Sequence, residues 1–317
     1  MSKRAIVLGG AGLIGSHLSV RLLKDGYDVV VIDKRGRRES PILRSIENRD
    51  RFHYIKHDIT IPYEIGCDEL YNLTSPIEFG NEFDYIDQMK LTSMGIINSL
   101  NNTIGNDTKV LYASSDDVYN FDRLDVEYQS DRFFLAEAKR FGESLHRAHQ
   151  AHYNIDLRVA RIFSTYGANS GLRDQHVIGK MIVEALHNHD IAIYGNGEQV
   201  RTFCWVEDIV DGLIRMMRTH THERIIIADL GSPNQITIRE LAEMIITLTG
   251  SKSNIYHISA RADEPRYKIP HLKTAQNELK WEASTPLKEG LLRTINYIEK
   301  ELSLIAINQM SWIEIYG

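Results

Sequence analysis

The stretch Ala5-Ile6-Val7-Leu8-Gly9-Gly10-Ala11-Gly12-Leu13-Ile14-Gly15 decides the fold of this chain. Its first four residues are all apolar, which predicts a short parallel strand that is buried on both faces. Glycines then follow in the spacing G-x-x-G-x-x-G, at Gly9, Gly12 and Gly15. Such glycines allow a tight turn, bring the backbone close to a pyrophosphate and let the next helix pack on the sheet. The stretch therefore predicts a dinucleotide site, in which the helix N-terminus at Leu13 and Ile14 faces the phosphates.

A second apolar run, Val29-Val30-Val31-Ile32, ends at Asp33. An acidic residue at the end of the second strand accepts hydrogen bonds from the adenosine ribose and repels a 2′-phosphate, so we expect NAD rather than NADP. The basic stretch Lys34-Arg35-Gly36-Arg37-Arg38 follows. It is interpreted either as a solvated loop or as a loop near the adenosine end of the cofactor. Arg35 leaves a further alternative open, because a nearby arginine can accept the additional phosphate of NADP.

Strand-like and helix-like segments alternate along the first half of the chain. Further strands are expected at residues 53–58, 69–73, 110–113 and 157–161, with helices over about 83–100 and 132–152. This alternation predicts a doubly wound, mainly parallel α/β sheet of the Rossmann type. After residue 167 the pattern changes to helices at 177–186, 236–248 and 287–302 and a strand at 191–194. We therefore expect an NAD-binding domain over residues 1–167, with a further strand and helix from about 200–230. A smaller C-terminal α/β cap for the substrate is expected over 168–317.

Composition excludes several classes of partner. The chain has 317 residues, a formal net charge of −6 and no basic stripe, which argues against nucleic acid. No apolar run approaches the ~20 residues that a membrane span needs. The two cysteines indicate a reducing compartment, and the direct start of the first strand leaves no room for a signal peptide, so we expect a cytoplasmic protein. No metal site is expected, and His146, His149 and His152 are interpreted as an exposed polar helix face.

Several stretches resemble a known family. They are Gly9–Leu18, His57-Asp58-Ile59, Leu73-Thr74-Ser75-Pro76, Ala113–Tyr119, Arg158–Gly167 and Tyr194–Arg201. Together they are similar to the NAD-dependent epimerase/dehydratase family of extended short-chain dehydrogenases, along almost the whole chain. The Leu-x-Ser-Pro motif and the run Glu264-Pro265-Arg266 ahead of Leu279-Lys280-Trp281 resemble the UDP-glucuronate decarboxylases in particular.

The resemblance implies NAD as the cofactor and a nucleotide sugar, first of all a UDP-sugar, as the substrate. Asp58 and Ile59 would contact the adenine, Leu73 would run under the cofactor, and Lys139 would hydrogen-bond the nicotinamide ribose. The residues expected at the sugar nucleotide are Ser75, Thr165, Arg201 and Arg266. The two arginines would pair with the diphosphate through charge-assisted, forked contacts.

The family's chemistry depends on a tyrosine four residues before the lysine, on the same face of one helix. That tyrosine removes the proton of the sugar 4-hydroxyl while NAD accepts the hydride from C4, and the 4-keto sugar then loses CO₂, epimerises or dehydrates. Here the lysine is Lys139, and the tyrosine position is Leu135, which cannot take a proton. The remaining catalytic candidates are Ser115, Asp117 and Ser114.

Other positions also depart from the family pattern. Thr92 and Ser164 stand where asparagines are expected, and Asp117 stands where a glutamate is expected. Tyr119 and Tyr128 are candidate replacement acids, although Tyr119 is also interpreted as a core residue. Asp117 is equally a general base or a cap of the following turn.

Three hypotheses follow from these departures. The chain is an enzyme that moves the proton through Asp117, a serine or a water; an enzyme that retains NAD(H) and performs a single oxidation or reduction; or a binding protein without catalysis. The resemblance also implies a homodimer, packed through the helix that carries Lys139 and the one over 89–100. The apolar residues Phe133, Phe134, Phe141 and Leu145 allow this dimer or simple burial in the core.

Overall fold

The computed structural model describes residues 2–36, 40–75, 85–119, 131–169, 176–222, 224–260 and 268–307. The chain divides into two compact units. The first contains residues 1–162, 209–230 and 270–282, and the second contains 163–208, 231–269 and 283–317. Compared with the sequence expectation, the boundary lies a few residues earlier, and a segment near the C-terminus, 270–282, joins the first unit.

The first unit is built on a seven-stranded sheet in the order β11-β6-β5-β4-β1-β2-β3, in which every pair of neighbours is parallel. Its strands are β1 (Arg4–Leu8), β2 (Asp28–Asp33), β3 (Phe52–Lys56), β4 (Glu69–Asn72), β5 (Lys109–Ser115), β6 (Asp156–Ile162) and β11 (Ile225–Leu230). With the smaller sheets of the second unit, this confirms the predicted fold class.

The strand order fixes where a ligand can bind. From β1 the chain moves outward to β2 and β3, and then returns to β4 on the other side of β1. In open α/β sheets, ligands bind at the carboxyl ends of the strands where this reversal occurs. Gly9 follows β1 directly and Leu73 follows β4 directly, so the predicted cofactor turn lies at the reversal point.

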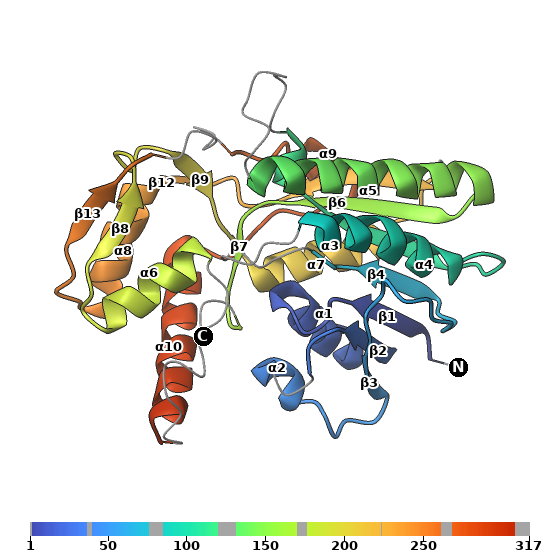
Figure 1. Cartoon of the computed structure of the whole chain (residues 1–317), viewed down its shortest axis with the longest axis horizontal. Coiled ribbons are helices and arrows are strands. Elements are labelled where there is room, and N and C mark those ends of the chain that lie inside the picture. The colour runs from blue at the N-terminus through green and yellow to red at the C-terminus, as the bar shows by residue number, and fades with distance from the viewer. Residues whose placement is uncertain are drawn as a thin grey trace. The chain divides into compact units, whose positions relative to one another are not determined.

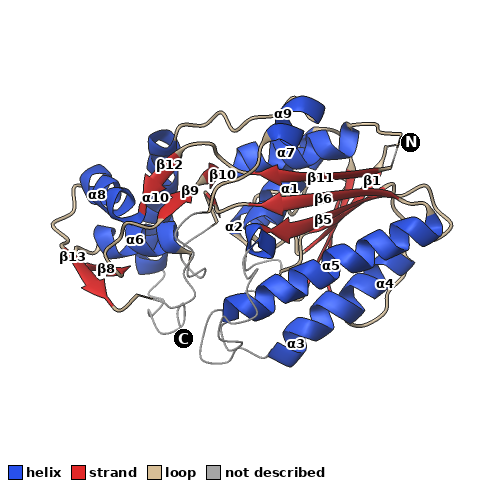
Figure 2. Cartoon of the chain, turned by 90° about the horizontal axis from the view of Figure 1, so that it is seen from above, coloured by secondary structure: helices blue, strands red, loops and turns tan. Residues whose placement is uncertain are grey.

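Helices cover both faces of this sheet, as Figure 1 and Figure 2 show. They are α1 (Leu13–Lys24), α2 (Pro41–Arg44), α3 (Tyr85–Lys90), α4 (Ile96–Asn101), α5 (Asp131–Tyr153), α7 (Val206–Arg218, in this unit from Ile209) and α9 (Lys273–Glu278), with a π-helical turn η2 (Leu91–Gly95) and a 3₁₀ turn η3 (Asp116–Tyr119). On the α4 face, Ile96 and Leu100 join one apolar cluster with Ile6 and Leu8 of β1. On the other face, Arg21 of α1 forms an ion pair with Asp211 of α7 at 3.7 Å.

His146 differs from its interpretation as part of an exposed polar face. Helix α5 turns this side chain toward the sheet, where it is fully buried. Its ring stacks on Tyr112 of β5 with centroids 4.2 Å apart, and Nδ1 donates to the carbonyl oxygen of Gly142 at 2.7 Å. Burial lowers the pKa of His146 to about 4, so the ring is neutral. The expectation was wrong for His146, whereas His152 is exposed.

Within its described residues, the second unit contains short strand pairs and three further helices. The strands β8 (Ile191–Tyr194) and β13 (Ile255–Ile258) pair in parallel, as do β7 (Thr165–Tyr166) and β10 (Cys204–Trp205), and β9 (Val200–Thr202) pairs antiparallel with β12 (Gln235–Thr237). The helices are α6 (Val177–Leu186), α8 (Ile238–Thr249) and α10 (Leu287–Ile307). Helix α8 begins with a capping box, in which Thr237 and Glu240 satisfy each other's backbone N–H groups.

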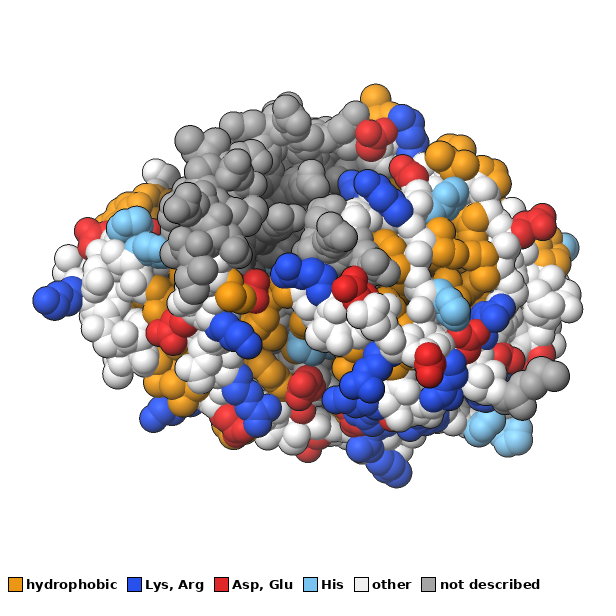
Figure 3. Space-filling model, turned by 90° about the horizontal axis from the view of Figure 1, so that it is seen from below, with side chains coloured by type: hydrophobic (Ala, Val, Ile, Leu, Met, Phe, Trp, Pro, Cys, Tyr) orange, Lys and Arg blue, Asp and Glu red, His pale blue; other side chains and the backbone are white. Residues whose placement is uncertain are grey.

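Charges on the surface are mixed rather than sorted by sign. Figure 3 shows lysines, arginines and acidic side chains interspersed over the described part of one face. Among the described residues, oppositely charged side chains also pair directly, as Arg215 does with Asp211 and Arg218 with Asp25. Among the helices of the described residues, none is both long and apolar enough to traverse a bilayer.

Two glycines of the first turn have different steric surroundings. A Cβ on Gly15 would lie 2.5 Å from the carbonyl oxygen of Gly9 and 2.6 Å from Cα of Gly10. Both are backbone atoms of the tight turn, in which Gly9 itself has a φ of +71°. A Cβ on Gly12 would meet nothing closer than 3.3 Å. A Cβ at position 15 would therefore clash with the backbone of the turn, whereas a Cβ at position 12 would make a tight contact with the Gly9 carbonyl oxygen that a shift of a few tenths of an ångström relieves.

We predict that Gly15→Ala lowers the free energy of unfolding by about 1–3 kcal/mol, because the backbone around it must shift. Gly12→Ala is the matched control and should lower the stability less than Gly15→Ala while weakening NAD binding, since its methyl group projects where a pyrophosphate would approach. Urea denaturation measures the first effect and titration with NAD the second. Equal destabilisation by the two substitutions would contradict this assignment.

Candidate functional site

The turn after β1 has the features of a pyrophosphate cradle. Gly12 is the N-cap of α1, no side chain caps this helix end, and its first turn contains no acidic residue. The N-terminal N–H groups and the positive end of the helix dipole therefore face the position beside Gly12, where the cofactor phosphates are expected. The backbone of Gly9 passes close to that of Leu73, because a Cβ on Gly9 would lie 3.0 Å from the Leu73 carbonyl oxygen. These residues fit NAD in the way that the sequence predicts.

Asp33 ends β2 with a carboxylate that is only 5% exposed. Its Oδ2 accepts the N–H of Ala11 at 2.9 Å, which ties the strand end to the glycine turn. Arg35 supplies the other contacts: its backbone N–H and its Nε donate to Oδ1 at 3.0 and 3.3 Å. The arginine of the basic stretch thus lies at the adenosine end of the expected cofactor site, whereas Arg37 and Arg38 lie outside the described residues.

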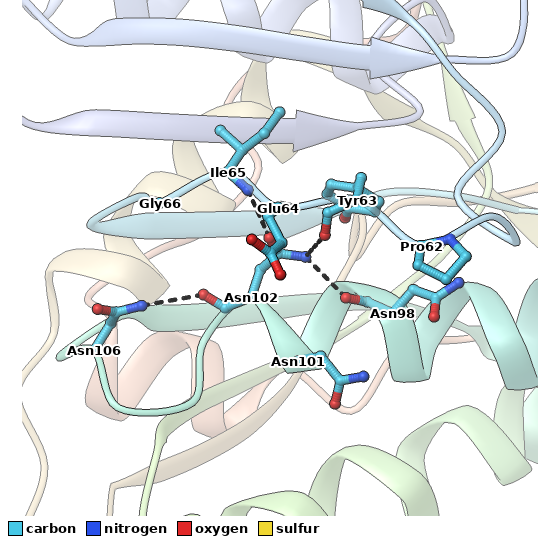
Figure 4. A pocket seen from close by; sticks show the side chains of 9 residues that line it. All are labelled: Pro62, Tyr63, Glu64, Ile65, Gly66, Asn98, Asn101, Asn102 and Asn106. Atoms are coloured by element: carbon cyan, nitrogen blue, oxygen red, sulfur yellow. Dashed lines mark hydrogen bonds between the residues drawn. The ribbon is translucent and has the colours of Figure 1, made fainter.

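The segment expected at the adenine is held by Asn98 of α4, and the chain that follows it is held by Asn102, the residue just after α4. The carbonyl oxygen of Ile59 accepts from Nδ2 of Asn98 at 2.9 Å, and Asn102 bonds both the carbonyl of Tyr63 and the N–H of Ile65. A surface hollow of about 710 Å³, shown in Figure 4, is lined by residues that include Asn98, Asn102, Tyr63 and Ile65. The amides of Asn98 and Asn102 bind the protein's own backbone. We therefore interpret these contacts as structural, because they hold the loop after β3 against the end of α4.

Lys139 is the central charge of the site. Its side chain is 3% exposed, and its ammonium group donates to the carbonyl oxygens of Ala113 at 2.9 Å and Thr74 at 3.2 Å. These carbonyls belong to β5 and to the loop after β4, so one side chain of α5 ties two strand ends together. Burial lowers the pKa of Lys139 to about 8, against the opposing effects of Asp117 and Glu143.

The serines at the end of β5 have different partners. Ser114 is buried and donates to Oε1 of Glu143 at 2.6 Å. Ser115 donates to Oδ2 of Asp117 at 3.1 Å, is 3.2 Å from Oδ1 of Asp116, and accepts the N–H of Asp117 at 3.2 Å. The structure therefore brings Ser115, Asp117 and Lys139 together at one sheet edge, while Ser114 is directed at helix α5.

Leu135 lies on α5 one turn before Lys139 and is partly buried. Thr92 lies in the π-helical turn η2, is 4% exposed, and donates to the carbonyl oxygen of Met89 at 3.3 Å. A π-helical turn inside a helix is rare and often accompanies functional sites. Neither Leu135 nor Thr92 supplies a group that titrates near neutral pH.

A network of polar side chains that the sequence did not indicate extends from Ser114. Glu143 forms a forked ion pair with Arg161 of β6, at 2.9 and 2.7 Å. Arg161 donates to the hydroxyl of Tyr119 at 2.9 Å, and this hydroxyl donates to Asp229 at the end of β11 at 2.7 Å. Locally, the sequence shows only that Arg161 and Asp229 lie near strand ends, Tyr119 in the turn after β5 and Glu143 on α5. Their pairing depends on contacts between residues that are far apart in sequence, and the sequence alone does not reveal these contacts.

The environment of Tyr119 argues against its role as a replacement acid. Burial and the hydrogen bond to Asp229 raise the pKa of Tyr119 to about 12, against the lowering effect of Arg161. Its side chain is 40% exposed, so the alternative interpretation as a core residue was wrong. Tyr128, the second candidate, lies outside the described residues.

The expected sugar-nucleotide residues fall in different parts of the chain. Ser75 lies in the first unit, two residues beyond Leu73. Thr165 and Arg201 belong to the second unit: Thr165 donates to the carbonyl oxygen of Phe163 at 2.9 Å, and Arg201 of β9 is 5% exposed. Arg266 lies outside the described residues. Nowhere in the described ranges do three or more His, Cys, Asp or Glu side chains gather in a way that could hold a metal ion.

The family follows from comparison with known sequences. Residues 5–228 match the NAD dependent epimerase/dehydratase family. The chain belongs to this family. UDP-glucuronic acid decarboxylase 1 of Xenopus tropicalis is 33% identical over 324 residues, covering 97% of this chain and 75% of that protein. UDP-glucuronic acid decarboxylase 3 of Arabidopsis thaliana is 32% identical, covering 91% of this chain and 86% of that protein.

Solved structures share the fold of this family member. Epimerase Mth375 of Methanothermobacter thermautotrophicus has a TM-score of 0.83 at 23% identity, covering 96% of this chain and 95% of that one. UDP-glucuronic acid 4-epimerase of Bacillus cereus, solved in complex with UDP-glucuronic acid and NAD, has a TM-score of 0.81 at 24% identity, covering 94% and 99%. These likenesses establish the architecture of the chain.

Lys139 gives the site a measurable pH signature. Between a pKa of about 8 in the folded chain and the ordinary value of 10.5, the unfolded chain binds a proton that the folded chain does not. The free energy of unfolding therefore rises with pH across this window, by up to about 3 kcal/mol. Lys139→Met should remove this rise, whereas substitution of the exposed Lys180 by Met should keep it. Urea denaturation from pH 7.5 to 10 measures the slopes, and identical slopes in wild type and Lys139→Met would disprove the assignment.

Proposed function

We propose that the chain is an NAD-dependent nucleotide-sugar enzyme that acts through a 4-keto sugar, with proton transfer by Ser115 and Asp117. The observation that carries this proposal is the hydrogen bond from Ser115 Oγ to Asp117 Oδ2, 3.1 Å long, at the carboxyl end of β5. That edge of the sheet is where ligands of this fold bind, and the buried Lys139 lies there as well. A serine that donates to a carboxylate is oriented to accept a proton from a substrate hydroxyl.

The proposed proton path has one donor and one final acceptor. The sugar 4-hydroxyl gives its proton to Ser115 Oγ as the C4–H bond breaks, and Ser115 passes its own proton to Asp117. Asp117 thus ends protonated, and the 4-oxygen becomes a carbonyl. Bound NAD supplies the hydride acceptor for this oxidation. The carboxylate is 7% exposed, so water is largely kept away from the transfer.

Lys139 acts on this path as a charge and as a positioning group. Its ammonium fixes the backbone of Ala113, two residues before Ser115. When charged, it also stabilises the negative charge that develops on the 4-oxygen, as preorganised charges do in a site with little water. Leu135 supplies no proton and forms an apolar wall one helical turn away.

The proposed substrate and reaction are inferred from the relatives. UDP-glucuronic acid decarboxylases are 31–33% identical to this chain, which favours a UDP-sugar with a carboxylate, and decarboxylation ahead of epimerisation or dehydration. In this proposal Ser75, Thr165 and Arg201 contact the sugar nucleotide, with Arg201 on its diphosphate. The second unit would serve as the substrate cap.

A second candidate function is binding of the cofactor and the sugar without catalysis. Leu135 favours it, because the relatives' chemistry is implied to depend on a tyrosine at this position. This alternative needs the glycine turn at Gly12 and the hydrogen bonds of Lys139, and in it the contacts between Ser115 and Asp117 only stabilise the turn after β5.

Mass spectrometry separates the two candidates. Purified protein and NAD would be incubated with UDP-, dTDP- and GDP-sugars, including UDP-glucuronate. Loss of CO₂, of water or of two hydrogens would establish an enzyme and name its reaction class. An epimerisation leaves the mass unchanged, so the recovered sugars would also be separated by chromatography, which distinguishes the two C4 isomers. No change with any sugar, while sugar and NAD bind, would favour the binding protein.

We predict that Asp117→Asn lowers turnover by about 10²–10⁴-fold, the usual contribution of a general base. Ser115→Ala should cause a similar loss, and the double substitution should cost little more, because both groups belong to one path. NAD affinity, measured by calorimetry, should stay unchanged in each variant. Full activity of Asp117→Asn would disprove the proposed path.

Leu135→Tyr provides a converse test in the same assay. If the pocket is otherwise like that of the family, a hydroxyl at this position should strongly raise C4 oxidation, even in the Asp117→Asn background. Leu135→Phe is the matched control, since it adds a ring without a hydroxyl. A well-folded Leu135→Tyr variant with no change in rate would show that the family's mechanism does not apply to this pocket.

A homodimer through α4 and α5 is part of the proposal. Ile97 of α4 is 44% exposed and Phe141 of α5 is 48% exposed, and these two helices contact each other. Exposed apolar groups on adjacent helices are typical of an interface, whereas Leu145 packs against the core.

We predict that Ile97→Glu together with Phe141→Glu produces a monomer, because two charges would be buried without partners in the interface. Leu292→Glu on α10, where leucine is 40% exposed, is the matched control and should leave the dimer intact. Light scattering after size exclusion gives the mass of each variant. A wild-type monomer, or a dimer that survives the double substitution, would contradict this interface.

A further inference from the structure

Tyr112 of β5 is a buried tyrosine whose hydroxyl is not hydrogen-bonded to the residues around it. Its side chain is 1% exposed, and it belongs to the apolar cluster that contains Leu8 and Ile96. None of the described residues donates or accepts a hydrogen bond at this hydroxyl. Phenylalanine at this position would therefore lose no hydrogen bond to them, and the contacts that define the place of Tyr112 are those of its ring.

Helix α5 lies against this ring because Gly142 has no side chain. A Cβ on Gly142 would overlap the Tyr112 hydroxyl oxygen and would lie 2.7 Å from Cζ. One turn before Gly142, the ammonium nitrogen of Lys139 lies over the Tyr112 ring, 5.3 Å from its centroid. One turn after Gly142, the His146 ring stacks on Tyr112 with centroids 4.2 Å apart. Residues three and four apart share a face of a helix, so one face of α5 is fitted to this ring.

The charge of Lys139 depends on the groups around its ammonium. Burial lowers the pKa of Lys139 to about 8, and Asp117 of η3 and Glu143 of α5 act in the opposite direction. His146 stays neutral while the lysine titrates, because burial lowers the pKa of His146 to about 4. The face of an aromatic ring is negative and attracts an ammonium group within about 6 Å, most strongly where water is excluded. The Tyr112 ring therefore adds an attraction to those of the two carboxylates.

We propose that Tyr112 is a positioning residue for Lys139, because its ring holds the ammonium group in place and in the charged form. The consequence for catalysis rests on the proposed function, in which the charged lysine stabilises the negative charge that develops on the sugar 4-oxygen. The ring does this without a further group that ionises near neutral pH. Burial and the charge of Glu143 raise the pKa of the Tyr112 phenol far above its usual range, so the phenol stays neutral while the lysine titrates.

Simple packing in the core is the alternative explanation of Tyr112, and the electrostatics of the ring separate the two. Fluorine atoms on a phenylalanine ring withdraw negative charge from its face and change its shape little. A residue that only fills the core would leave the titration of Lys139 unchanged along a series of increasingly fluorinated rings. A residue that attracts the ammonium would shift this titration in steps.

Titration of Lys139 in the full chain, followed by NMR of lysines labelled with ¹³C at Cε, tests the inference. The Lys139 signal is identified by its loss in Lys139→Met, and Tyr112→Phe should titrate like the wild type. Mono-, di- and trifluorinated phenylalanine at position 112 should lower the Lys139 midpoint in steps. Tyr112→Leu should lower it by about one pH unit, which is about tenfold in proton affinity. The exposed Lys180 is the internal control and should not move.

Each outcome has a distinct meaning. Equal Lys139 midpoints in the phenylalanine and trifluorinated variants would overturn the inference, because the ring would then only fill the core. A common shift of Lys139 and Lys180 would overturn it as well, since its cause would not be local. The fluorinated series decides even where Tyr112→Leu fails to fold. If the midpoints fall as expected but no nucleotide sugar is turned over, this inference stands and the proposed function fails.

Discussion

The ammonium group of Lys139 is the constraint on which the site depends. It is buried, and its two hydrogen bonds go to backbone carbonyls at the ends of adjacent strands. A charge in such a place is costly unless it is paired and hydrogen-bonded. Asp117 and Glu143 supply the opposite charge, one from the turn after β5 and one from α5. The lysine and the two carboxylates thus stabilise one another, and Ser114 and Ser115 donate hydrogen bonds to those carboxylates.

Glu143 connects the surroundings of Lys139 to two further strands of the sheet. By binding Arg161 through both carboxylate oxygens, it joins α5 to β6, and Arg161 continues through Tyr119 to Asp229 on β11. The carboxyl edge of the sheet is therefore a network in which donors and acceptors are paired across elements. A network of this kind holds its members in fixed positions, as catalysis and selective binding both require.

Much of the fold could be predicted because its signals are local. The apolar run before Gly9, the glycine spacing and the apolar run before Asp33 identified β1, the turn, α1 and β2 within one or two residues. The short strands β7, β9, β10 and β12 were not predicted, because two or three residues carry no periodicity. The burial of His146 and the pairing of Glu143 with Arg161 were missed for another reason. Both depend on which side of α5 faces the sheet, and that is decided by contacts between distant segments.

Strands β2, β3, β4 and β5 share one local feature at their carboxyl ends. At or within two residues of the end of each, a side chain accepts the backbone N–H two residues later. The pairs are Asp33 with Arg35, Asp58 with Thr60, Asn72 with Thr74, and Ser115 with Asp117. Short polar side chains favour such turns because they accept a hydrogen bond from an N–H that no longer pairs with a neighbouring strand. Each turn also fixes the residue two places on, and in three of the four that residue has a further role: Arg35 on the cofactor turn, Thr74 as an acceptor of Lys139, and Asp117 as the partner of Ser115. Parallel strands bring their carboxyl ends to one edge, so turns that are encoded locally in four separate segments all lie along the same edge of the sheet.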